Sequence, residues 1–519
     1  MNLDDGLLQR LVLPIALCGL IACIWTNLHS WYRLRHIPGP SQAALSSFWL
    51  AFTSLKGQNN DLWIHLDEKY GQLVRVAPNL VTTSDPKTIR RMASARSTCW
   101  KDEWYRRARF EAGIDTLFTL LHPRAHDEYK SKAAAGYSGR EAPSIETSIN
   151  EQIQAAIDLL RHKYLSTSTG GNTGDQVNDQ QKSLFRPLDM ANFSTYFTLD
   201  VITKVAFGEA FGCLQHDADV SGFITELQGF LPFGSFLSYI PSWLYDAISL
   251  TLSYTTRLDD SQGVGLLRRI ARESVTKRFE QSADAQKDML GAFMRHGMSF
   301  EECRDEATFM IATGSDTTSS VIHYTMLHLM TNPRVYQTLK NTVRQAVLQG
   351  SASCPITQKE AMVLPYLRAV IFEGLRMRAP APGIHARVTS KEGEHICGKF
   401  IPPGTGVGTN VSAMLLNPDL FGADAASFRP ERFLDAENLG DAAIRLRMER
   451  DVELVFGYGR WQCAGKTVAF MELSKIYFEL FRHFDFELIN PINPIQRTNS
   501  YGLWIEEGMM VKVTDAPVI

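Results

Sequence analysis

One long helix places the strongest constraint on how this chain can fold. Ser299-Phe-Glu-Glu302 is a capping box, in which the serine and glutamate side chains bond backbone N–H groups at a helix start. The next helix-stopping pair is Asn332-Pro333, so the sequence predicts a single helix over about residues 299–330. Apolar residues at helical spacing predict further helices over 87–165, 188–211, 334–349, 359–379 and 463–483.

Strand patterns are few and short. Residues 73–83 predict two strands around a turn at Pro78-Asn79, and residues 383–412 suit further short strands. No alternation of strands with helices is present, which argues against a doubly wound parallel sheet. We therefore expect a mainly α fold with small β-sheets.

Composition narrows the class of protein. The chain has 519 residues and a formal net charge of −3, so it has no global basic field and nucleic acid is not an expected partner. Its eight cysteines are scattered and contain no C-x-x-C pair. They indicate free thiols in a reducing compartment, and each one taken alone is best interpreted as a small buried apolar residue.

The N-terminus has the pattern of a membrane anchor. Residues 11–25 carry no charge, and with their flanks (7–28) they approach the length that a bilayer requires. Asp4 and Asp5 precede this run and Arg33 and Arg35 follow it, which favours an uncleaved anchor with a cytosolic body over a cleaved signal peptide. We expect an anchor with its basic flank over residues 1–36 and one large domain over 37–519.

A glycine-rich loop precedes a single cysteine near the C-terminus. Residues 456–465 read FGYGRWQCAG, and Gly457, Gly459 and Gly465 allow tight bends and a close approach to a flat ligand. Cys463 stands where this loop is expected to give way to a helix, and the backbone N–H groups at such a position stabilise a thiolate. The string F-x-x-G before C-x-G-x-x-x-A is far more specific than a glycine-rich loop alone.

Two further patterns lie in predicted helices. The first is a pair of opposite charges at helical spacing, and the second is a run of poor helix formers. Glu373 and Arg376 lie on one helix face, an arrangement that in isolation is most often a solvated surface pair. Residues 312–318 (ATGSDTT) place a glycine and adjacent threonines in the middle of the long helix. These residues are poor helix formers, and such local conflict is more typical of functional sites than of scaffolds.

Taken together, these segments resemble the cytochromes P-450, and the resemblance covers essentially the whole chain from Pro38 onward. It implies the cytochrome P-450 fold, a single haem domain behind a transmembrane helix, with haem b as the cofactor and Cys463 as the axial iron ligand. It implies a structural role for Glu373 and Arg376, joined by Arg432 of the segment 428–433 (FRPERF). Asp316 and Thr317 match the motif that relays protons during oxygen activation.

The same resemblance implies which residues contact the cofactor and the substrate. Where many members have an arginine two residues before the cysteine, this chain has Trp461, with Arg460 one residue earlier, and either could reach a haem propionate. The other candidate cofactor contacts are Arg387, His126, Lys130 and Phe456. Candidate substrate contacts are Trp104, Phe110, Leu117, Phe118, Phe309, Thr313, Ile384, Leu503 and Trp504, although plain core packing explains any one of them equally well.

The function implied by the resemblance is a monooxygenase acting on an apolar small molecule with O2. Residues 132–140 (KAAAGYSGR) are similar to fungal members related to pisatin demethylase, which indicates secondary metabolism. The chain has no convincing nucleotide-binding motif, so electrons from NADPH would come through a separate NADPH–cytochrome P-450 reductase, docked near Lys132, Lys466 and Lys475. The implied location is the endoplasmic reticulum membrane, with one transmembrane pass and the catalytic domain in the cytosol.

Other classes remain open from the sequence. A haem-thiolate isomerase or dehydratase would use no external electrons, and the Asp316–Thr317 pair argues against it. A detoxifying demethylase is a second alternative, and a haem-free membrane scaffold is a third, against which the intact loop around Cys463 argues. The substrate and the carbon attacked do not follow from these motifs.

Overall fold

The computed structural model describes residues 19, 21, 24–109, 114–142, 144–166, 185–255, 263–280, 287–438 and 442–516. The candidate substrate residue Phe110 and most of the candidate anchor lie outside these ranges. Within them the chain is mainly helical, with small sheets, as the sequence predicts.

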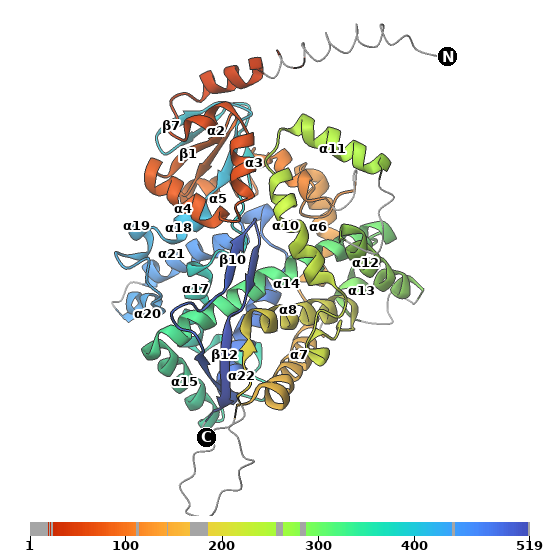
Figure 1. Cartoon of the computed structure of the whole chain (residues 1–519), viewed down its shortest axis with the longest axis vertical. Helices are drawn as coiled ribbons and strands as arrows, with labels where there is room; N and C mark the ends of the chain where they lie inside the picture. The colour runs from red at the N-terminus through yellow and green to blue at the C-terminus, as the bar shows by residue number, and fades with distance from the viewer. Residues whose placement is uncertain are drawn as a thin grey trace, which may run out of the picture.

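The helices pack around the long helix α14 (Phe300–Thr331; Figure 1). They are α2 (Ser41–Leu45), α3 (Phe48–Ser54), α4 (Asn59–Tyr70), α5 (Pro86–Ala93), α6 (Pro123–Tyr137), α7 (Ile145–Leu159), α8 (Met190–Phe207), α9 (Cys213–His216), α10 (Phe223–Leu237), α11 (Ser242–Thr255), α12 (Gly263–Phe279), α13 (Met289–Arg295), α14 (Phe300–Thr331), α15 (Pro333–Leu348), α16 (Gln358–Met362), α17 (Pro365–Met377), α18 (Val411–Leu415), α19 (Pro418–Phe421), α20 (Glu431–Asn438), α21 (Ala442–Val452) and α22 (Lys466–His483). Short helical turns are η1 (Glu103–Ala108), η2 (Leu160–Tyr164), η3 (Glu453–Phe456) and η4 (Gly459–Trp461).

The central element is α14, the long helix predicted from the capping box. The Glu302 N–H donates to Ser299 Oγ at 3.1 Å, and the Ser299 N–H donates to Glu302 Oε2 at 2.8 Å, so the capping box is confirmed. Helix α8 lies against α14 at Gly314, where an added Cβ would come within 2.8 Å of the Ile202 side chain. The glycine therefore allows the close approach of the two helices.

The strands form four small sheets among the described residues. They are β1 (Leu73–Ala77), β2 (Leu80–Thr83), β3 (Trp100–Lys101), β4 (Leu188–Asp189), β5 (Arg387–Val388), β6 (Glu394–Ile396), β7 (Lys399–Ile401), β8 (Gly406–Thr409), β9 (Phe484–Leu488), β10 (Arg497–Ser500), β11 (Trp504–Glu507) and β12 (Met510–Asp515). The largest sheet has the order β1-β2-β8-β5-β3, with β2 and β8 parallel and its other neighbours antiparallel. It places Lys101 opposite Arg387.

The helical segments differ from the sequence prediction at several places. Among the described residues, the range 87–165 is divided into α5, α6, α7 and η2, with strand β3 and η1 between α5 and α6. The helix expected over 359–379 is divided into α16 and α17, because Pro365 disfavours helix at the residue before it and starts α17 afresh. The last helix begins at Lys466 and not at Cys463–Ala464, with Gly465 as its N-cap. Cys463 thus lies in the turn before the helix.

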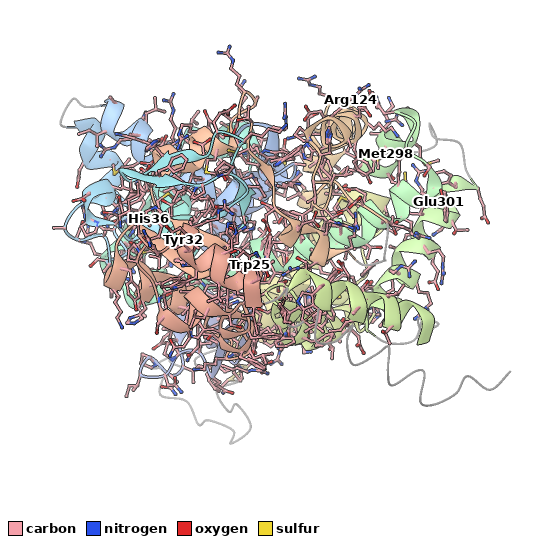
Figure 2. All side chains as sticks on the ribbon, turned by 90° about the horizontal axis from the view of Figure 1, so that it is seen from above. Trp25, Tyr32, His36, Arg124, Met298 and Glu301 are labelled. Carbon is pink, nitrogen blue, oxygen red and sulfur yellow. The ribbon has the colours of Figure 1, made fainter. Side chains whose placement is uncertain are left out.

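The N-terminal end of the described chain joins the body before residue 37. Leu34 is fully buried, in one cluster with Ile37, Leu73 and Val81. Further out, Trp25 and Tyr32 are 70% and 58% exposed, and Figure 2 shows them with His36 on the N-terminal segment. No helix among the described residues combines the length and the apolar character needed to cross a bilayer.

Candidate active site at the Cys463 loop

The loop before Cys463 is bent by glycines at positive φ. Gly457 and Gly459 have φ of 72° and 59°, and a Cβ on Gly457 would meet the Trp461 carbonyl oxygen at 2.9 Å. The Cys463 N–H donates to the carbonyl oxygen of Phe456 at 2.7 Å, which closes the loop. These residue types therefore hold Cys463 at a defined position between η4 and α22.

The surroundings of Cys463 shift the pKa of its thiol in opposite directions. Its side chain has accessible surface, yet the surrounding protein removes enough water that desolvation raises the pKa of the thiol. The backbone N–H groups of Gly465 and Lys466 and the ammonium group of Lys130 work against that rise by stabilising the thiolate. The site is thus prepared for a negatively charged sulfur once a further positive charge lies beside it.

Lys130 and Arg460 are both engaged with the protein itself. Lys130 Nζ donates to the Arg460 carbonyl oxygen at 2.7 Å, so it braces the loop. Arg460 Nε lies 3.1 Å from Asp127 Oδ2, and its guanidinium group also donates to the Ala95 carbonyl oxygen at 3.2 Å. Of the two candidates left open by the sequence, Trp461 is therefore the one that faces the interior, where it is 9% exposed.

Three nitrogen-bearing side chains surround the Trp461 ring. The His126 ring centroid is 4.4 Å from it, Lys101 Nζ is 4.9 Å from its centroid and the Arg387 guanidinium carbon is 5.2 Å away. We call Lys101 and Arg387 the cation cluster, and His126 packs against the same ring beside them. No ion pair joins Lys101 or Arg387 to a carboxylate among the described residues, and Arg387 Nε has no hydrogen-bond partner there.

The cation cluster is bonded to neutral acceptors: Lys101 Nζ donates to the Leu117 and Phe118 carbonyl oxygens at 3.1 and 2.6 Å, and Arg387 Nη1 donates to the Tyr105 hydroxyl. Burial, followed by the positive charge of Arg387, lowers the pKa of Lys101 well below its ordinary value. Burial and then the charges of Lys101, Lys130 and Arg387 lower the pKa of His126 to about 2, so its imidazole is neutral. Lys101 was not predicted as a site residue, because it belongs to a two-residue strand with no motif, and only its pairing with Arg387 places it here.

An aromatic group connects the cation cluster to α14. Lys101 Nζ lies 4.9 Å from the Tyr105 ring centroid, and the Tyr105 and Phe118 ring centroids are 4.9 Å apart. Phe118 stacks on Phe309 of α14 at 5.0 Å. Trp104 packs edge-on against Phe118 at 6.3 Å, and its Nε1 has no partner among the described residues. The structure thus brings three predicted substrate residues, Trp104, Phe118 and Phe309, together.

The middle of α14 carries the predicted proton-relay residues. Thr313 Oγ1 donates to the Phe309 carbonyl oxygen at 2.9 Å, and Thr317 Oγ1 donates to the Thr313 carbonyl oxygen at 2.8 Å. Asp316 is 6% exposed, and its Oδ2 has no partner in the described part of the chain. Burial, followed by the negative charge of Glu506, raises the pKa of Asp316 to about 7. This carboxyl group can therefore gain or lose a proton near neutral pH.

The remaining predicted substrate residues lie in different settings. Ile384 is 1% exposed, and it packs against the five-stranded sheet at Gly408. Leu117 lies in the core, and its N–H donates to Glu306. Trp504 donates through Nε1 to the Ala379 carbonyl oxygen at 2.9 Å, and the Arg378 guanidinium group covers its ring. Trp504 thus belongs to an ionic cluster, for which the sequence had no signal.

Glu373, Arg376 and Arg432 form a buried network. Arg376 donates two hydrogen bonds to the Glu373 carboxylate, through Nε and Nη2, each at 2.8 Å. Arg432 Nε lies 3.0 Å from Glu373 Oε1. The side chains of all three are at most 2% exposed. Arg376 Nη1 donates to the Leu415 and Ala425 carbonyl oxygens at 2.9 and 2.6 Å, so the charges are compensated and their hydrogen bonds satisfied.

A row of aromatic rings links this network to the cysteine loop. The ring centroids of Phe433 and Phe372 are 5.8 Å apart, those of Phe372 and Phe470 are 5.6 Å apart, and those of Phe470 and Phe456 are 5.4 Å apart. Phe456 is the residue whose carbonyl oxygen accepts the Cys463 N–H. Helices α17, α20 and α22 therefore support the loop as one packed unit.

The lysines expected to dock a redox partner are not equivalent. Lys475 is fully buried and bonds Glu146 Oε1 at 2.8 Å and the Ile356 carbonyl oxygen, so its expected role in docking is wrong. The resemblance could not distinguish a helix face turned to the core from one turned to solvent. Lys132 and Lys466 are partly exposed and pair with Glu302 and Glu453.

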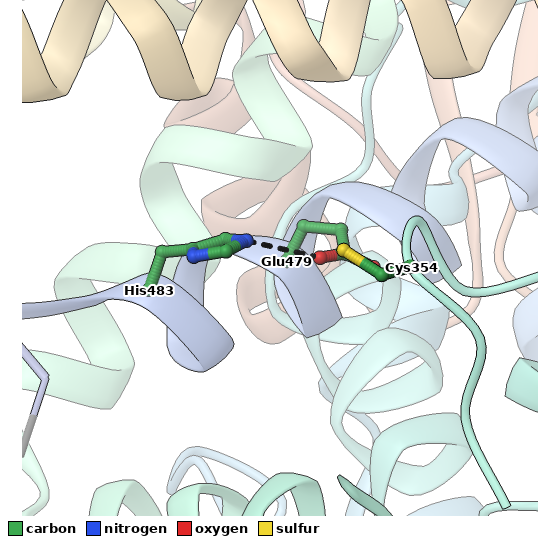
Figure 3. A group of neighbouring side chains, drawn as sticks. All are labelled: Cys354, Glu479 and His483. Atoms are coloured by element: carbon green, nitrogen blue, oxygen red, sulfur yellow. Dashed lines mark ion pairs between the residues drawn. The ribbon is translucent and has the colours of Figure 1, made fainter. Parts of the chain in front are cut away.

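A cluster of possible metal ligands lies between α22 and the segment before α16. Cys354, Glu479 and His483 place their ligand atoms within 4.8 Å of one another (Figure 3). The Glu479 carboxylate already accepts the Ile356 N–H at 2.6 Å and lies 3.2 Å from Arg482 Nη1 through both oxygens. Because this carboxylate is neutralised by an arginine, we assign no metal to the cluster.

Comparisons with known proteins agree with the geometry. The model of the cytochrome P450 family matches residues 38–513. The chain is 42% identical to cytochrome P450 monooxygenase aba1 of Botryotinia fuckeliana over 93% of this chain and 92% of that protein. It is 38% identical to cytochrome P450 monooxygenase ABA1 of Pyricularia oryzae over 96% of each chain, and 27% identical to cytochrome P450 monooxygenase gsfF of Penicillium aethiopicum over 97% and 99%.

Proposed function

Because this chain belongs to the cytochrome P450 family and is a monooxygenase, we propose that it inserts one oxygen atom of O2 into an apolar small molecule of fungal secondary metabolism. One observation carries the proposal. Contacts run from Trp461 of the Cys463 loop through Lys101, Tyr105 and Phe118 to Phe309 of α14, whose carbonyl oxygen accepts a hydrogen bond from Thr313, and Asp316 and Thr317 follow on the same helix. The aromatic rings in this row suit an apolar substrate.

The residues present fit a haem group, which the family implies. Haem carries two propionate anions, and Lys101 and Arg387 are buried basic side chains with no carboxylate ion pair among the described residues. Its iron takes a thiolate, and the Gly465 and Lys466 N–H groups together with the charge of Lys130 favour the thiolate form of Cys463. We propose that Lys101, Arg387 and Trp461 would hold the propionates and that the Cys463 thiolate would bind the iron.

Each residue has a proposed part in the reaction. When bound, the haem supplies the chemistry that activates O2 and oxidises the substrate. Trp104, Phe118 and Phe309 bind and orient the substrate and exclude water from it. Asp316 carries protons from solvent into the site, and Thr317, one residue further along α14, passes them on. Glu373, Arg376 and Arg432 keep the loop behind the cofactor rigid.

We propose that electrons come from NADPH through a separate reductase and that the protein acts at the endoplasmic reticulum membrane. The support for a membrane is an end of the molecule with exposed apolar side chains. Trp25 and Leu28 lie on the N-terminal segment, and Trp243 and Leu250, 60% and 59% exposed, lie on α11. The two elements lie at the same end of the molecule (Figure 1).

The carbon monoxide difference spectrum of the reduced protein tests the thiolate assignment. The full-length protein should show the red-shifted Soret band of a haem-thiolate, and Cys463→Ser should lose it. Cys354→Ser, which changes an exposed thiol remote from the loop, is the matched control and should keep the band. A thiolate spectrum in Cys463→Ser would refute the assignment. NADPH-dependent turnover then separates an oxygenase from a haem-thiolate isomerase, which needs no electrons.

A further inference from the structure

A buried ionic cluster lies behind the middle of α14. His323 of α14 contacts the Glu506 carboxylate of β11 through Nε2, and Arg378, at the end of α17, forms an ion pair with the other carboxylate oxygen. The side chains of the three residues are at most 6% exposed. None of them belongs to a motif used above, and we call them the Glu506 cluster.

The Glu506 cluster is held rigidly. The Arg378 guanidinium carbon lies 3.5 Å from the Trp504 ring centroid and 3.9 Å from that of Tyr324, so the group is clamped between two aromatic faces. Thr498 Oγ1 donates to Glu506 Oε1 at 3.2 Å. The cluster therefore joins the β10–β11 hairpin, α14 and the end of α17 in one arrangement.

Glu506 is a permanent anion in this arrangement. Burial acts to raise the pKa of Glu506, but His323 and Arg378 outweigh it and hold the pKa at about 2. Buried ion pairs of this kind seldom add net stability, because desolvating the charges costs about as much as their attraction returns. The Glu506 cluster therefore fits a role other than stabilising the fold.

Asp316 is the ionisable group that this anion influences. It precedes His323 by seven residues, about two helical turns, so both lie on the same side of α14. Burial and then the charge of Glu506 account for its raised pKa. Other charged groups on elements packed against α14 make no resolved contribution to it; these include Asp200 of α8, Glu373 and Arg376 of α17, Lys340 of α15 and Glu472 of α22.

We propose that the Glu506 cluster positions a fixed negative charge behind Asp316 and so keeps this carboxyl group a proton carrier at neutral pH. Glu506 and its partners do not touch the substrate or the cofactor in this scheme, so they are positioning residues. The inference rests on the proposed function for its purpose, which is proton supply to the oxygenation site. The electrostatic link itself does not depend on that function.

Infrared spectroscopy of the full-length holoprotein tests the link without any turnover. The C=O stretch of protonated Asp316 is assigned by its loss in Asp316→Asn, and its intensity is followed against pH. In Glu506→Gln/Arg378→Gln, which removes one charge of each sign, the titration midpoint should fall by about one pH unit or more. Glu506→Gln alone, with Arg378 still clamped by Trp504 and Tyr324, should shift it in the same direction and serves if the double variant does not fold.

Glu507→Gln is the matched control. It removes a neighbouring carboxylate of the same hairpin that is 47% exposed and paired with Arg497, and it should leave the midpoint unchanged. An unchanged midpoint in the Glu506 variants, or an equal shift in Glu507→Gln, would overturn the inference.

Turnover separates this inference from the proposed function. In wild type, product formed per NADPH should decline as pH rises above about 7, and in the Glu506 variants the decline should begin at lower pH. A shifted infrared midpoint in a protein that forms no product with NADPH would support the electrostatic link and refute the proposed function. A normal pH profile in both variants would refute the role of the cluster in proton supply.

Discussion

Thr317 has a hydroxyl that donates to its own helix and can still accept or relay a proton. Its Oγ1 donates to the Thr313 carbonyl oxygen. The preceding residue, Asp316, has a carboxylate oxygen with no partner among the described residues. Consecutive residues of α14 thus supply a buried acid and a hydroxyl, the two kinds of group that a proton relay uses. The proposed roles of both residues can be tested by substitutions that leave the helix intact.

Thr317→Ala should uncouple NADPH consumption from oxygenation. The variant keeps the helix but loses the hydroxyl, so product per NADPH should fall by about tenfold or more, with hydrogen peroxide as the alternative product. Thr331→Ala is the matched control, because Thr331 makes the same bond to its own helix at 2.8 Å but lies at the exposed end of α14. Normal coupling in Thr317→Ala would contradict the relay.

Asp316 should make the stability of the protein depend on pH. Its pKa is raised to about 7 in the folded protein, whereas the unfolded chain has the ordinary value of 3.8. The folded state then holds a proton that the unfolded state releases, so this contribution to stability is complete below 3.8 and is lost as pH rises to about 7. Asp316→Asn lacks this loss. The melting temperature of Asp316→Asn relative to wild type should therefore increase between about pH 5 and pH 8, and parallel curves would count against the raised pKa.

At the scale of elements, α17 and α20 are joined by charge and by aromatic packing. Glu373 and Arg376 lie on α17, Arg432 comes from α20, and the row of rings from Phe433 to Phe456 continues the contact to the cysteine loop. Short isolated helices are marginal in water, so these helices depend on the contacts between them. Among these contacts, we expect the network of Glu373, Arg376 and Arg432 to be the most sensitive to a single substitution.

Arg376→Ala should yield little folded holoprotein. It leaves the Glu373 carboxylate buried with incomplete compensation, a change that costs about 3–5 kcal/mol in folding free energy. Urea unfolding and the haem content of the purified protein measure the effect. Arg334→Ala breaks an ion pair whose arginine is 67% exposed and should cost about 1 kcal/mol or less. Wild-type haem content in Arg376→Ala would contradict the structural role.

For the whole molecule, contacts of the packed body extend to residues before position 37. Leu34 is fully buried, and Arg75, buried in β1, donates to the Trp31 carbonyl oxygen at 3.2 Å. Leu34 therefore packs with the folded domain although it lies within the basic flank of the proposed anchor. A truncation intended to free the protein from membranes has to respect this packing.

Two deletions should separate membrane attachment from folding. Removal of residues 1–28 should release the protein into the soluble fraction with its carbon monoxide spectrum intact. Removal of residues 1–36 also takes Leu34 out of its cluster, and a buried leucine contributes about 2–5 kcal/mol, so the spectrum and the yield should fall. Fractionation and spectra of both proteins are the measurement. Continued membrane attachment after the shorter deletion would place the anchoring surface on the body, with α11 as the first candidate.

The sequence by itself determined the structural features that depend on residues close to one another in the chain. The capping box and Pro333 defined the limits of α14, and the glycines around Cys463 encoded the bent loop. The family motifs named Glu373, Arg376 and Arg432, and the structure brings these three together. What only the tertiary structure decided depends on residues distant in the chain. Lys101 joins Arg387 through strand pairing, Lys475 turns out to be buried, and Glu506 acts on Asp316 across 190 positions. Charge acts through space and desolvation depends on every neighbouring atom, so neither can be read from the order of residues alone.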